Sequence, residues 1–166
     1  ANFLQPVKIV DICAQQKKWL IHFSTSEVYG RTLASYLGDV DYSNPDLYEL
    51  DEDSTPLIMG PIGNQRWSYA TSKQLMERYI FGQHKETGLP FTTVRPLNFF
   101  GPKMDFIPGR DGEGVPRVLA CFMTALLDGQ PMQLVDEGTA RRTIVSIHDA
   151  IQAIVLMIRN RDRAVN

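Results

Sequence analysis

Two short runs of mostly apolar or β-branched residues, each preceded by a helical segment, constrain the fold of this chain most. Residues 19–23 are apolar except for His22, and residues 91–95 follow a Gly-Leu-Pro break. Such runs are typical of parallel strands that are covered on both faces. Because helical segments and strands alternate along the chain, we expect an α/β fold with a mainly parallel sheet.

Apolar residues recur at helical spacing in four segments, and two further short runs resemble strands. We expect helices over residues 1–16, from Ser68 as the N-cap to about His84, over 118–127 and over 149–159, and additional strands over 132–135 and 143–147. Residues 29–66 are polar and are interrupted by proline and glycine. This segment is too long for a routine connection, so we predict a functional loop.

Composition narrows the classes of protein to which the chain can belong. Of its 166 residues, 43% are hydrophobic, which is enough to form an ordinary core. The net charge of −2 is too small to indicate a nucleic-acid or membrane partner. No apolar run approaches the roughly 18 residues of a membrane span. Cys13 and Cys121 lie far apart and predict neither a disulfide framework nor a metal site, so we expect a cytoplasmic protein without a metal.

Tyr69 and Lys73 form the strongest local motif. Four residues apart on a predicted helix, they share one face at a distance of about 6 Å. A free phenol has a pKa near 10 and is a poor base at neutral pH, and lowering such a pKa to about 7 requires roughly 4 kcal/mol. A neighbouring ammonium supplies much of that by favouring the phenolate. Taken alone, however, the pair is more often a solvated lysine beside a packing tyrosine.

Thr25 and Glu27 lie where the first predicted strand opens into a loop. In open parallel sheets, ligands bind beyond the carboxyl ends of the strands. There Thr25 can hydrogen-bond a substrate hydroxyl and Tyr69, and Glu27 supplies a carboxylate. Taken singly, Thr25 and Ser26 are as easily loop caps, and Glu27 a surface charge. Together with the Tyr-x-x-x-Lys motif, they predict a catalytic site.

Three motifs of the chain resemble those of the extended short-chain dehydrogenase/reductases that act on nucleotide sugars, the NAD-dependent epimerase/dehydratase family. The motifs are Ser24-Thr-Ser-Glu-Val-Tyr-Gly30, Tyr69-x-x-x-Lys73 and Arg95-Pro-Leu-Asn-Phe-Phe-Gly-Pro102. Within that family the chain is similar to UDP-glucuronate decarboxylases and especially to UDP-apiose/UDP-xylose synthases, over essentially its whole length. The resemblance implies part of a Rossmann-type doubly wound parallel sheet plus elements of the small substrate-binding subdomain.

The resemblance also implies roles for individual residues. The catalytic positions of the family match Thr25, Glu27, Tyr69 and Lys73, with Glu27 implicated in decarboxylation. Its UDP-sugar-binding positions match Thr25, Ser26, Arg66, Asn98, Gln133 and Arg142. Its NAD-binding positions match Tyr69, Lys73 and Pro96. Arg142 suits a diphosphate because its planar fork fits phosphate oxygens.

The implied reaction is an oxidative decarboxylation of UDP-glucuronate. Tyr69 removes the proton of the sugar 4-hydroxyl while a hydride passes from C4 to NAD⁺. The resulting ketone is β to the C6 carboxylate, so carbon dioxide leaves readily. The product is a UDP-4-keto-pentose or, after reduction, UDP-xylose. Relatives commonly dimerise through a four-helix bundle, so we also expect a homodimer that uses the helix carrying Tyr69 and residues 1–16.

Ser26 separates the alternatives within the family. The related 4,6-dehydratases carry Asp at this position, so Ser26 weighs against dehydration. The plant apiose-forming enzymes carry Cys there, so Ser26 favours plain decarboxylation over ring contraction. A UDP-apiose/UDP-xylose synthase and a nucleotide-sugar 4-epimerase remain alternatives. A catalytically silent UDP-sugar-binding domain is an alternative of another class, against which the complete set of Thr25, Tyr69 and Lys73 argues.

The Gly-rich turn of a dinucleotide-binding fold is not found in this sequence. We therefore expect residues 1–131 to be the C-terminal half of a Rossmann-like NAD-binding domain, with the catalytic motif but without that loop. Residues 132–166 are expected to be part of the sugar-nucleotide-binding region. Both ends of the chain look cut, so the isolated segment is expected to be inactive and to bind NAD weakly or not at all.

Overall fold

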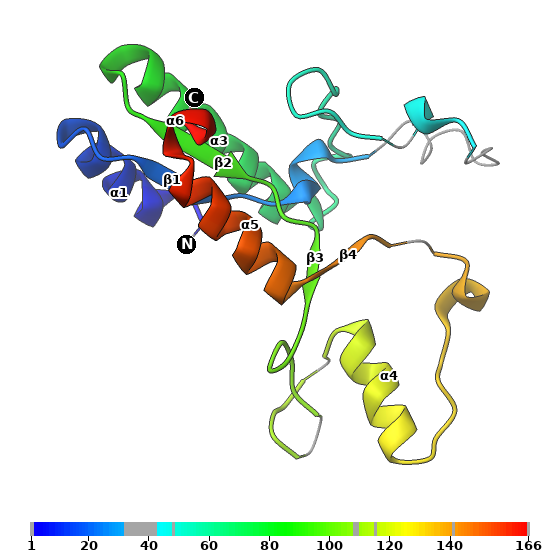
Figure 1. The fold of residues 1–166 in the computed structure, drawn as a ribbon. Coiled ribbons are helices and arrows are strands. Elements are labelled where there is room, and N and C mark those ends of the chain that lie inside the picture. The colour runs from blue at the N-terminus through cyan, green and yellow to red at the C-terminus, as the bar shows by residue number, and fades with distance from the viewer. Residues whose placement is uncertain are drawn as a thin grey trace. The chain divides into compact units, whose positions relative to one another are not determined.

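The computed structural model describes residues 2–31, 43–47, 49–107, 110–114, 116–140 and 142–165. They form two compact units (Figure 1). The first unit comprises Ala1–Pro96 and Met157–Asn166, and the second comprises Leu97–Leu156. The functional boundary expected between residues 131 and 132 stays a prediction.

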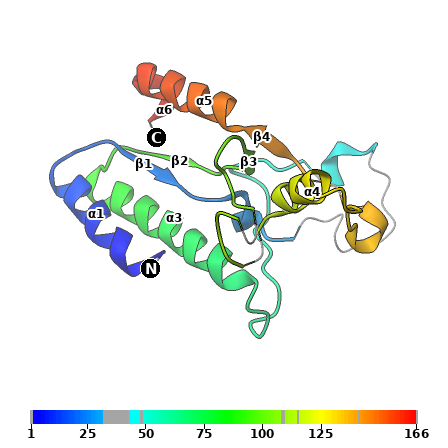
Figure 2. The ribbon, with the colours of Figure 1, turned by 90° about the horizontal axis from the view of Figure 1, so that it is seen from below.

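The first unit is built on two parallel strands. Strand β1 (Leu20–Phe23) pairs with β2 (Phe91–Val94), with Leu20 opposite Phe91. Figure 2 shows helices α1 (Leu4–Gln15) and α3 (Trp67–Thr87) on one side of these strands and the short helix α6 (Arg161–Ala164) on the other. Both faces of the strand pair are therefore covered, as expected for a parallel sheet in an α/β fold.

The core of the first unit lies between α1, α3 and β2. Its buried residues are Val10, Ala14, Met76, Ile80, Leu89 and Phe91. Val10 and Ala14 are four residues apart on α1, and Met76 and Ile80 are four residues apart on α3. Each pair therefore lines one stripe of its helix, which explains why both segments fold as helices against the strands. The hydroxyl of Tyr79 on α3 donates a hydrogen bond of 2.5 Å to Asp11 on α1 and joins the two helices.

Helix α3 begins and ends close to the predicted residues, but its N-cap differs. The expected cap, Ser68, lies inside the first turn, and Arg66 is the N-cap. The reason is Asn64, whose side chain accepts a hydrogen bond from the Arg66 N–H at 3.2 Å and whose carbonyl accepts from Trp67. This turn starts the helix before Ser68 is reached. Gly88 ends the helix as predicted, with a φ of +70° that favours glycine.

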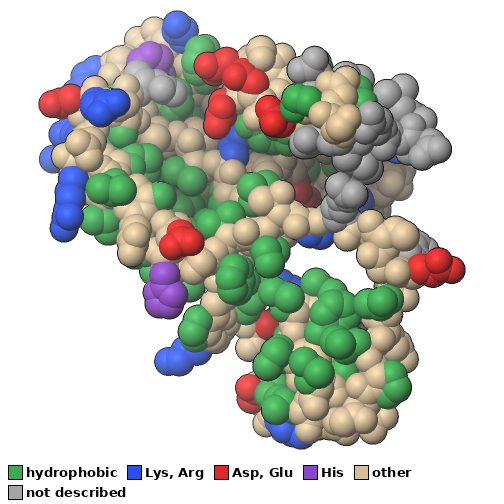
Figure 3. All heavy atoms as spheres, turned by 45° about the vertical axis from the view of Figure 1, so that its right-hand side comes forward, with side chains coloured by type: hydrophobic (Ala, Val, Ile, Leu, Met, Phe, Trp, Pro, Cys, Tyr) green, Lys and Arg blue, Asp and Glu red, His purple; other side chains and the backbone are tan. Residues whose placement is uncertain are grey.

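The second unit contains a second parallel pair of strands. Strand β3 (Asn98–Phe100) pairs with β4 (Ile144–Ser146), and helix α4 covers Val118–Leu127, the predicted residues. Helix α5 (Ile147–Arg159) begins two residues before its predicted start. Hydrophobic side chains gather on the surface of this unit, in the lower part of Figure 3. In α4, Val118, Met123 and Leu126 are each more than half exposed.

The strand predicted over residues 132–135 is wrong. Val135 begins a 3₁₀ turn (Val135–Gly138), and the residues before it have no strand partner among the described residues. Glu137 and Gly138 both have positive φ angles, +57° and +75°, and this left-handed backbone coils the chain at the point where a strand would continue.

The described parts of the predicted loop over 29–66 are held by a short bridge. Gly30 pairs with Ile58, and the Arg31 N–H donates to the Ile58 carbonyl at 2.8 Å. A β-carbon on Gly30 would lie 1.8 Å from that carbonyl oxygen, so only glycine fits. Residues 32–42 and 48 of this loop lie outside the described residues.

None of the helices in the described ranges is both long and apolar enough to cross a membrane. The longest, α3, carries charged residues along its length.

Candidate active site

Thr25 lies at the carboxyl end of β1, where it starts a 3₁₀ helix, η1 (Ser26–Tyr29). Its side-chain oxygen accepts a hydrogen bond of 3.2 Å from the Glu27 N–H, so Thr25 caps this turn. The capping role considered for Thr25 is therefore confirmed. This role leaves the Thr25 hydroxyl able to bind a ligand, because a hydroxyl that accepts one hydrogen bond still has its own proton to donate.

Helix α3 packs against η1 and carries Tyr69 and Lys73 one turn apart. The Lys73 ammonium donates a hydrogen bond of 2.7 Å to the carbonyl of Phe23, the last residue of β1. Tyr69 is 42% exposed and therefore accessible to a ligand. The fold thus places Lys73 at the carboxyl end of the strand that leads into Thr25.

Ser26 and Pro96 lie side by side at the ends of the two strands. The Ser26 N–H donates to the Pro96 carbonyl at 3.0 Å, and the Ser24 N–H donates to Val94 at 2.8 Å. These bonds extend the β1–β2 ladder past both strands. A residue predicted to bind the sugar nucleotide and one predicted to bind NAD therefore meet at one edge of the sheet.

Arg66 and Glu27 are both exposed in the first unit. The Arg66 guanidinium lies 5.4 Å from the ring centre of Trp67, its neighbour in the chain. Such a contact keeps the cation accessible while it covers an apolar ring. Their predicted functions, sugar-nucleotide binding by Arg66 and decarboxylation by Glu27, stay predictions.

The other predicted sugar-nucleotide residues belong to the second unit. The Asn98 side chain donates to the Thr143 carbonyl at 3.0 Å, which brings Asn98 beside the residue that follows Arg142. Gln133 is exposed in the segment between α4 and the 3₁₀ turn that starts at Val135. The fold of this unit therefore joins Asn98 with the Arg142 segment, although they are far apart in the sequence.

The sequence motifs did not predict that Arg95 makes several contacts near the candidate site. Its guanidinium donates to both carboxylate oxygens of Glu77, at 2.7 to 3.2 Å, and to the Glu52 carbonyl at 3.0 Å. It also lies 4.9 Å from the ring centre of Tyr29. Burial alone would lower the pKa of Arg95, but Glu77 and Tyr29 outweigh it and raise that pKa above its ordinary value. Glu77 lies four residues after Lys73 and so on the same face of the predicted helix. This spacing could have indicated that Glu77 lies near the candidate site.

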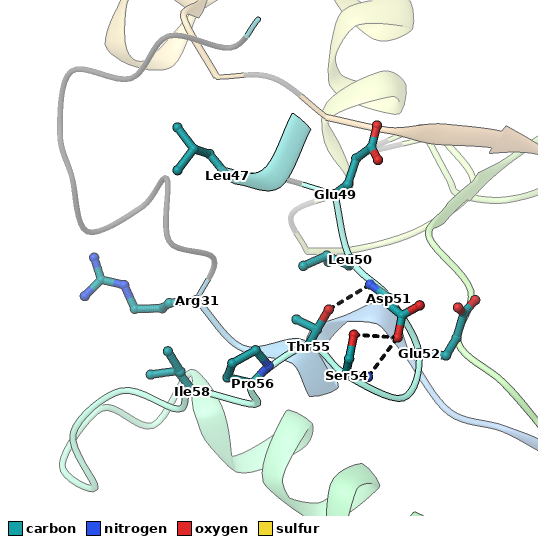
Figure 4. A pocket seen from close by; sticks show the side chains of 10 residues that line it. All are labelled: Arg31, Leu47, Glu49, Leu50, Asp51, Glu52, Ser54, Thr55, Pro56 and Ile58. Carbon is teal, nitrogen blue, oxygen red and sulfur yellow. Dashed lines mark hydrogen bonds between the residues drawn. The ribbon is translucent and has the colours of Figure 1, made fainter. Parts of the chain in front are cut away.

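The polar pocket in Figure 4 lies apart from the predicted residues. Its volume is about 490 Å³, and its lining includes Arg31, Glu49, Asp51 and Glu52. Asp51 accepts hydrogen bonds from the backbone and hydroxyl of Ser54 and from the Asp53 N–H. Those bonds, from Ser54 first, lower the pKa of Asp51. The carboxylate is therefore engaged in shaping its own loop. No predicted site residue lines this pocket.

His22 and Ser24 bring two buried polar atoms to β1 and to the residue that follows it. Both side chains follow the same face of the extended β1 segment. The Nε2 atom of His22 and the hydroxyl oxygen of Ser24 are buried and have no hydrogen-bond partner among the described residues. A histidine within a buried strand is normally a hydrogen-bonded core residue, but in the described part of the chain one nitrogen of His22 lacks a partner. Burial first and the positive charge of Lys73 second lower the pKa of His22, and Glu77 offsets part of the effect.

The lowered pKa of His22 predicts that stability falls in acid. Below the ordinary histidine pKa of about 6.5, the unfolded chain takes up a proton that the folded chain resists, so the free energy of unfolding decreases as pH falls. One proton can change the free energy of unfolding by at most about 1.4 kcal/mol per pH unit. The change from His22 stays below this limit, because the ring is only partly buried and its pKa is therefore lowered only in part. His22→Gln should flatten urea-unfolding stability between about pH 7.5 and 5. Exposed His148→Gln should not, and an unchanged slope in His22→Gln would contradict the assignment.

Known proteins share both the sequence and the fold of the chain. It is 54% identical to a UDP-D-apiose/UDP-D-xylose synthase of Oryza sativa subsp. japonica, over 99% of this chain and 42% of the rice protein. It is 52% identical to UDP-D-apiose/UDP-D-xylose synthase 2 of Arabidopsis thaliana, over 99% of this chain and 43% of that protein. The chain thus spans about two fifths of the length of these relatives.

A solved structure and a family model agree with these relatives. The PbgP3 protein of Burkholderia pseudomallei is 36% identical, with a TM-score of 0.72 over 95% of this chain and 43% of that protein. This confirms the predicted α/β fold. The model of the family described as "NAD dependent epimerase/dehydratase family" matches residues 1–166. The resemblance stated from the motifs is confirmed: the chain belongs to the NAD-dependent epimerase/dehydratase family.

Proposed function

We propose that the full-length protein is a cytoplasmic lyase that converts UDP-glucuronate to a UDP-4-keto-pentose or UDP-xylose by NAD-dependent oxidative decarboxylation. The observation that carries the proposal is the hydrogen bond from Lys73 to Phe23, which joins the Tyr-x-x-x-Lys helix to the strand end that leads into Thr25. The UDP-D-apiose/UDP-D-xylose synthases among its relatives support the same substrate class.

In this proposal Tyr69 takes the proton of the sugar 4-hydroxyl, and the positive charge of Lys73 stabilises the phenolate that Tyr69 requires. Thr25 donates its hydroxyl proton to the same sugar oxygen or to Tyr69. Glu27, exposed at the same strand end, aids the loss of carbon dioxide. Once C4 is a ketone, the C6 carboxylate is β to it, and the electrons of the breaking bond enter an enolate.

NAD fits the residues at this edge of the sheet. Lys73 uses one N–H for Phe23, which leaves two donors for the hydroxyls of a ribose. Tyr69 is exposed beside it, and Pro96 contributes the backbone at the neighbouring strand end. When bound, NAD supplies the acceptor for the hydride that leaves C4. The residues of this chain orient the cofactor and sugar and move the proton.

We assign the UDP part of the substrate to six polar residues of the chain. The proposed contacts are made by Thr25, Ser26, Arg66, Asn98, Gln133 and Arg142. Arg142 is the proposed partner of the diphosphate, because a guanidinium fork bonds two phosphate oxygens at once. We further propose that residues 1–131 are the C-terminal half of a Rossmann-like NAD-binding domain that carries the catalytic motif, and that residues 132–166 are part of the sugar-nucleotide-binding region. The isolated segment is proposed to be inactive and to bind NAD weakly at most.

A UDP-apiose/UDP-xylose synthase is the second candidate function. Identities of 54% and 52% to two such synthases favour it. Ser26 argues for the simpler decarboxylation, because the ring contraction is linked to a cysteine at this position. Epimerisation at C4 and silent binding of a UDP-sugar are the remaining alternatives.

Product analysis of the full-length protein distinguishes these functions. Incubation with UDP-glucuronate and NAD should release carbon dioxide. Chromatography of the nucleotide sugars should then show UDP-xylose or its 4-keto precursor. A branched pentose would favour the apiose-forming synthase instead. An epimerised UDP-hexuronate without carbon dioxide would overturn decarboxylation, and binding without turnover would support the silent domain.

We also propose that the protein is a homodimer that packs α1 and α3 of each subunit into a four-helix bundle. Apolar side chains on both helices support this proposal, since Ile9, Ile12 and Leu75 are each about half exposed. Sedimentation of the full-length protein should show a dimer, and Ile12→Glu should shift it toward the monomer. A wild-type monomer would refute the proposal.

A further inference from the structure

Arg95 contacts both of the elements that carry candidate catalytic residues. It follows β2 directly and is not itself one of the predicted site residues. Its guanidinium reaches Glu77 on α3, the ring of Tyr29 at the end of η1, and the backbone of Glu52. Among the residues that the structure describes, these contacts connect the Thr25–Tyr29 turn to the Tyr69–Lys73 helix through one rigid planar group.

The contact with α3 is geometrically demanding. Glu77 lies four residues after Lys73 and eight after Tyr69, so all three occupy one face of the helix. The side chains of Arg95 and Glu77 are only 18% and 12% exposed, and the guanidinium meets both carboxylate oxygens. A bidentate, largely desolvated pair fixes direction as well as distance, which opposes rotation of α3 about its axis.

The contact with η1 is made by the ring of Tyr29, its last residue. Tyr29 is 7% exposed, and its ring centre is 4.9 Å from Arg95. Its carbonyl accepts a hydrogen bond from the Ile58 N–H, so the residue is also anchored to the following loop. Arginine suits this position because its planar guanidinium can cover a ring and pair with both oxygens of a carboxylate at once, whereas the ammonium of lysine has no such planar fork.

We propose that Arg95 is a positioning residue that sets the distance between the Thr25–Glu27 segment, where η1 begins, and the Tyr69–Lys73 pair of α3. It touches no reacting group itself. The proposal rests on the proposed function for its kinetic consequence, because Thr25 and Tyr69 must meet the same sugar oxygen. A shift of about 1 Å between such groups is enough to cost roughly 10²-fold in rate.

Two variants of the full-length enzyme separate positioning from stability. Arg95→Met alone leaves Glu77 buried without its partner and should lower the thermal midpoint. Adding Glu77→Leu removes that carboxylate and should return the midpoint close to the wild-type value. In the double variant, kcat for UDP-glucuronate should still be about 10- to 100-fold lower, with KM changed less than about threefold. The double variant thus regains stability, but η1 and α3 remain without the contact that aligns them.

The matched control is an arginine–carboxylate pair in the second unit. Arg110 pairs with Asp128, and both side chains are more exposed, at 56% and 39%. The double variant Arg110→Met with Asp128→Leu should keep the wild-type kcat. If Arg95→Met with Glu77→Leu also keeps the wild-type kcat, the proposal is overturned. A raised KM with an unchanged kcat would overturn it as well, because that pattern indicates substrate binding.

Amide hydrogen exchange tests the same inference without any turnover. In η1, the Val28 N–H donates to Thr25 at 3.2 Å and the Gly30 N–H donates to Glu27 at 3.0 Å. If Arg95 holds this turn, both amides should exchange at least about tenfold faster in the double variant, since local opening becomes easier. Unchanged exchange would overturn the positioning role even if the enzyme acts on another sugar. If the wild-type enzyme shows no decarboxylation but the two amides exchange faster in the double variant, only the proposed function is contradicted.

Discussion

Tyr69→Phe in the full-length protein is expected to lower the rate of carbon dioxide release from UDP-glucuronate by about 10²- to 10⁴-fold, the range for loss of a positioned acid–base group. The ring remains and only the hydroxyl is lost. The KM for UDP-glucuronate should therefore change little, because the phenol acts on the proton in the transition state rather than in binding. Release of labelled carbon dioxide from UDP-glucuronate labelled at C6 measures kcat and KM directly.

Tyr79 provides the control on the same helix. Its hydroxyl donates to Asp11 on α1 and is not part of the candidate site. Tyr79→Phe makes the same chemical change, should cost about 1 kcal/mol of stability through the lost hydrogen bond, and should leave kcat unchanged. If Tyr69→Phe keeps wild-type decarboxylation, Tyr69 is not the base and the proposed mechanism is wrong.

The regular elements of the fold could be predicted where their signals are local. Helix α4 occupies the predicted residues 118–127, since its apolar spacing and its end at Asp128 lie within a single segment. Strand β3 was missed because three residues carry no periodicity, and their pairing with β4 depends on residues 46 positions later. The false strand over 132–135 has the opposite cause: its residues are suitable for a strand but have no partner among those described.

The candidate site divides in the same way. Tyr69 and Lys73 could be paired from helical spacing alone, and Thr25 could be placed at a strand end. Sequence spacing does not reveal that Lys73 bonds to the carbonyl of Phe23, fifty residues away, or that Arg95 stacks on Tyr29. Such contacts depend on how α3 packs near the end of β1 and on the register between β1 and β2, which only the folded chain defines.

Lys73→Met should lower kcat for decarboxylation by about 10²- to 10³-fold, the range for removal of one group that stabilises charge in an active site. The methionine keeps much of the length of the side chain but has no ammonium to stabilise a phenolate at Tyr69. It also cannot donate to Phe23, so the second turn of α3 loses its bond to the end of β1. Single-turnover rates with UDP-glucuronate and NAD measure the loss at the chemical step.

His22 supplies a readout of the same substitution that does not depend on catalysis. The charge of Lys73 is, after burial, the second cause that lowers the pKa of His22. Lys73→Met should therefore raise that pKa toward its ordinary value while burial keeps it below, as followed by NMR of the imidazole protons. Lys85→Met is the matched control, because Lys85 lies on the same helix with its ammonium 5.2 Å from the ring centre of Phe81. It should change neither kcat nor the titration of His22. If Lys73→Met shifts His22 but leaves kcat intact, the geometry at the end of β1 stands and Lys73 has no catalytic role.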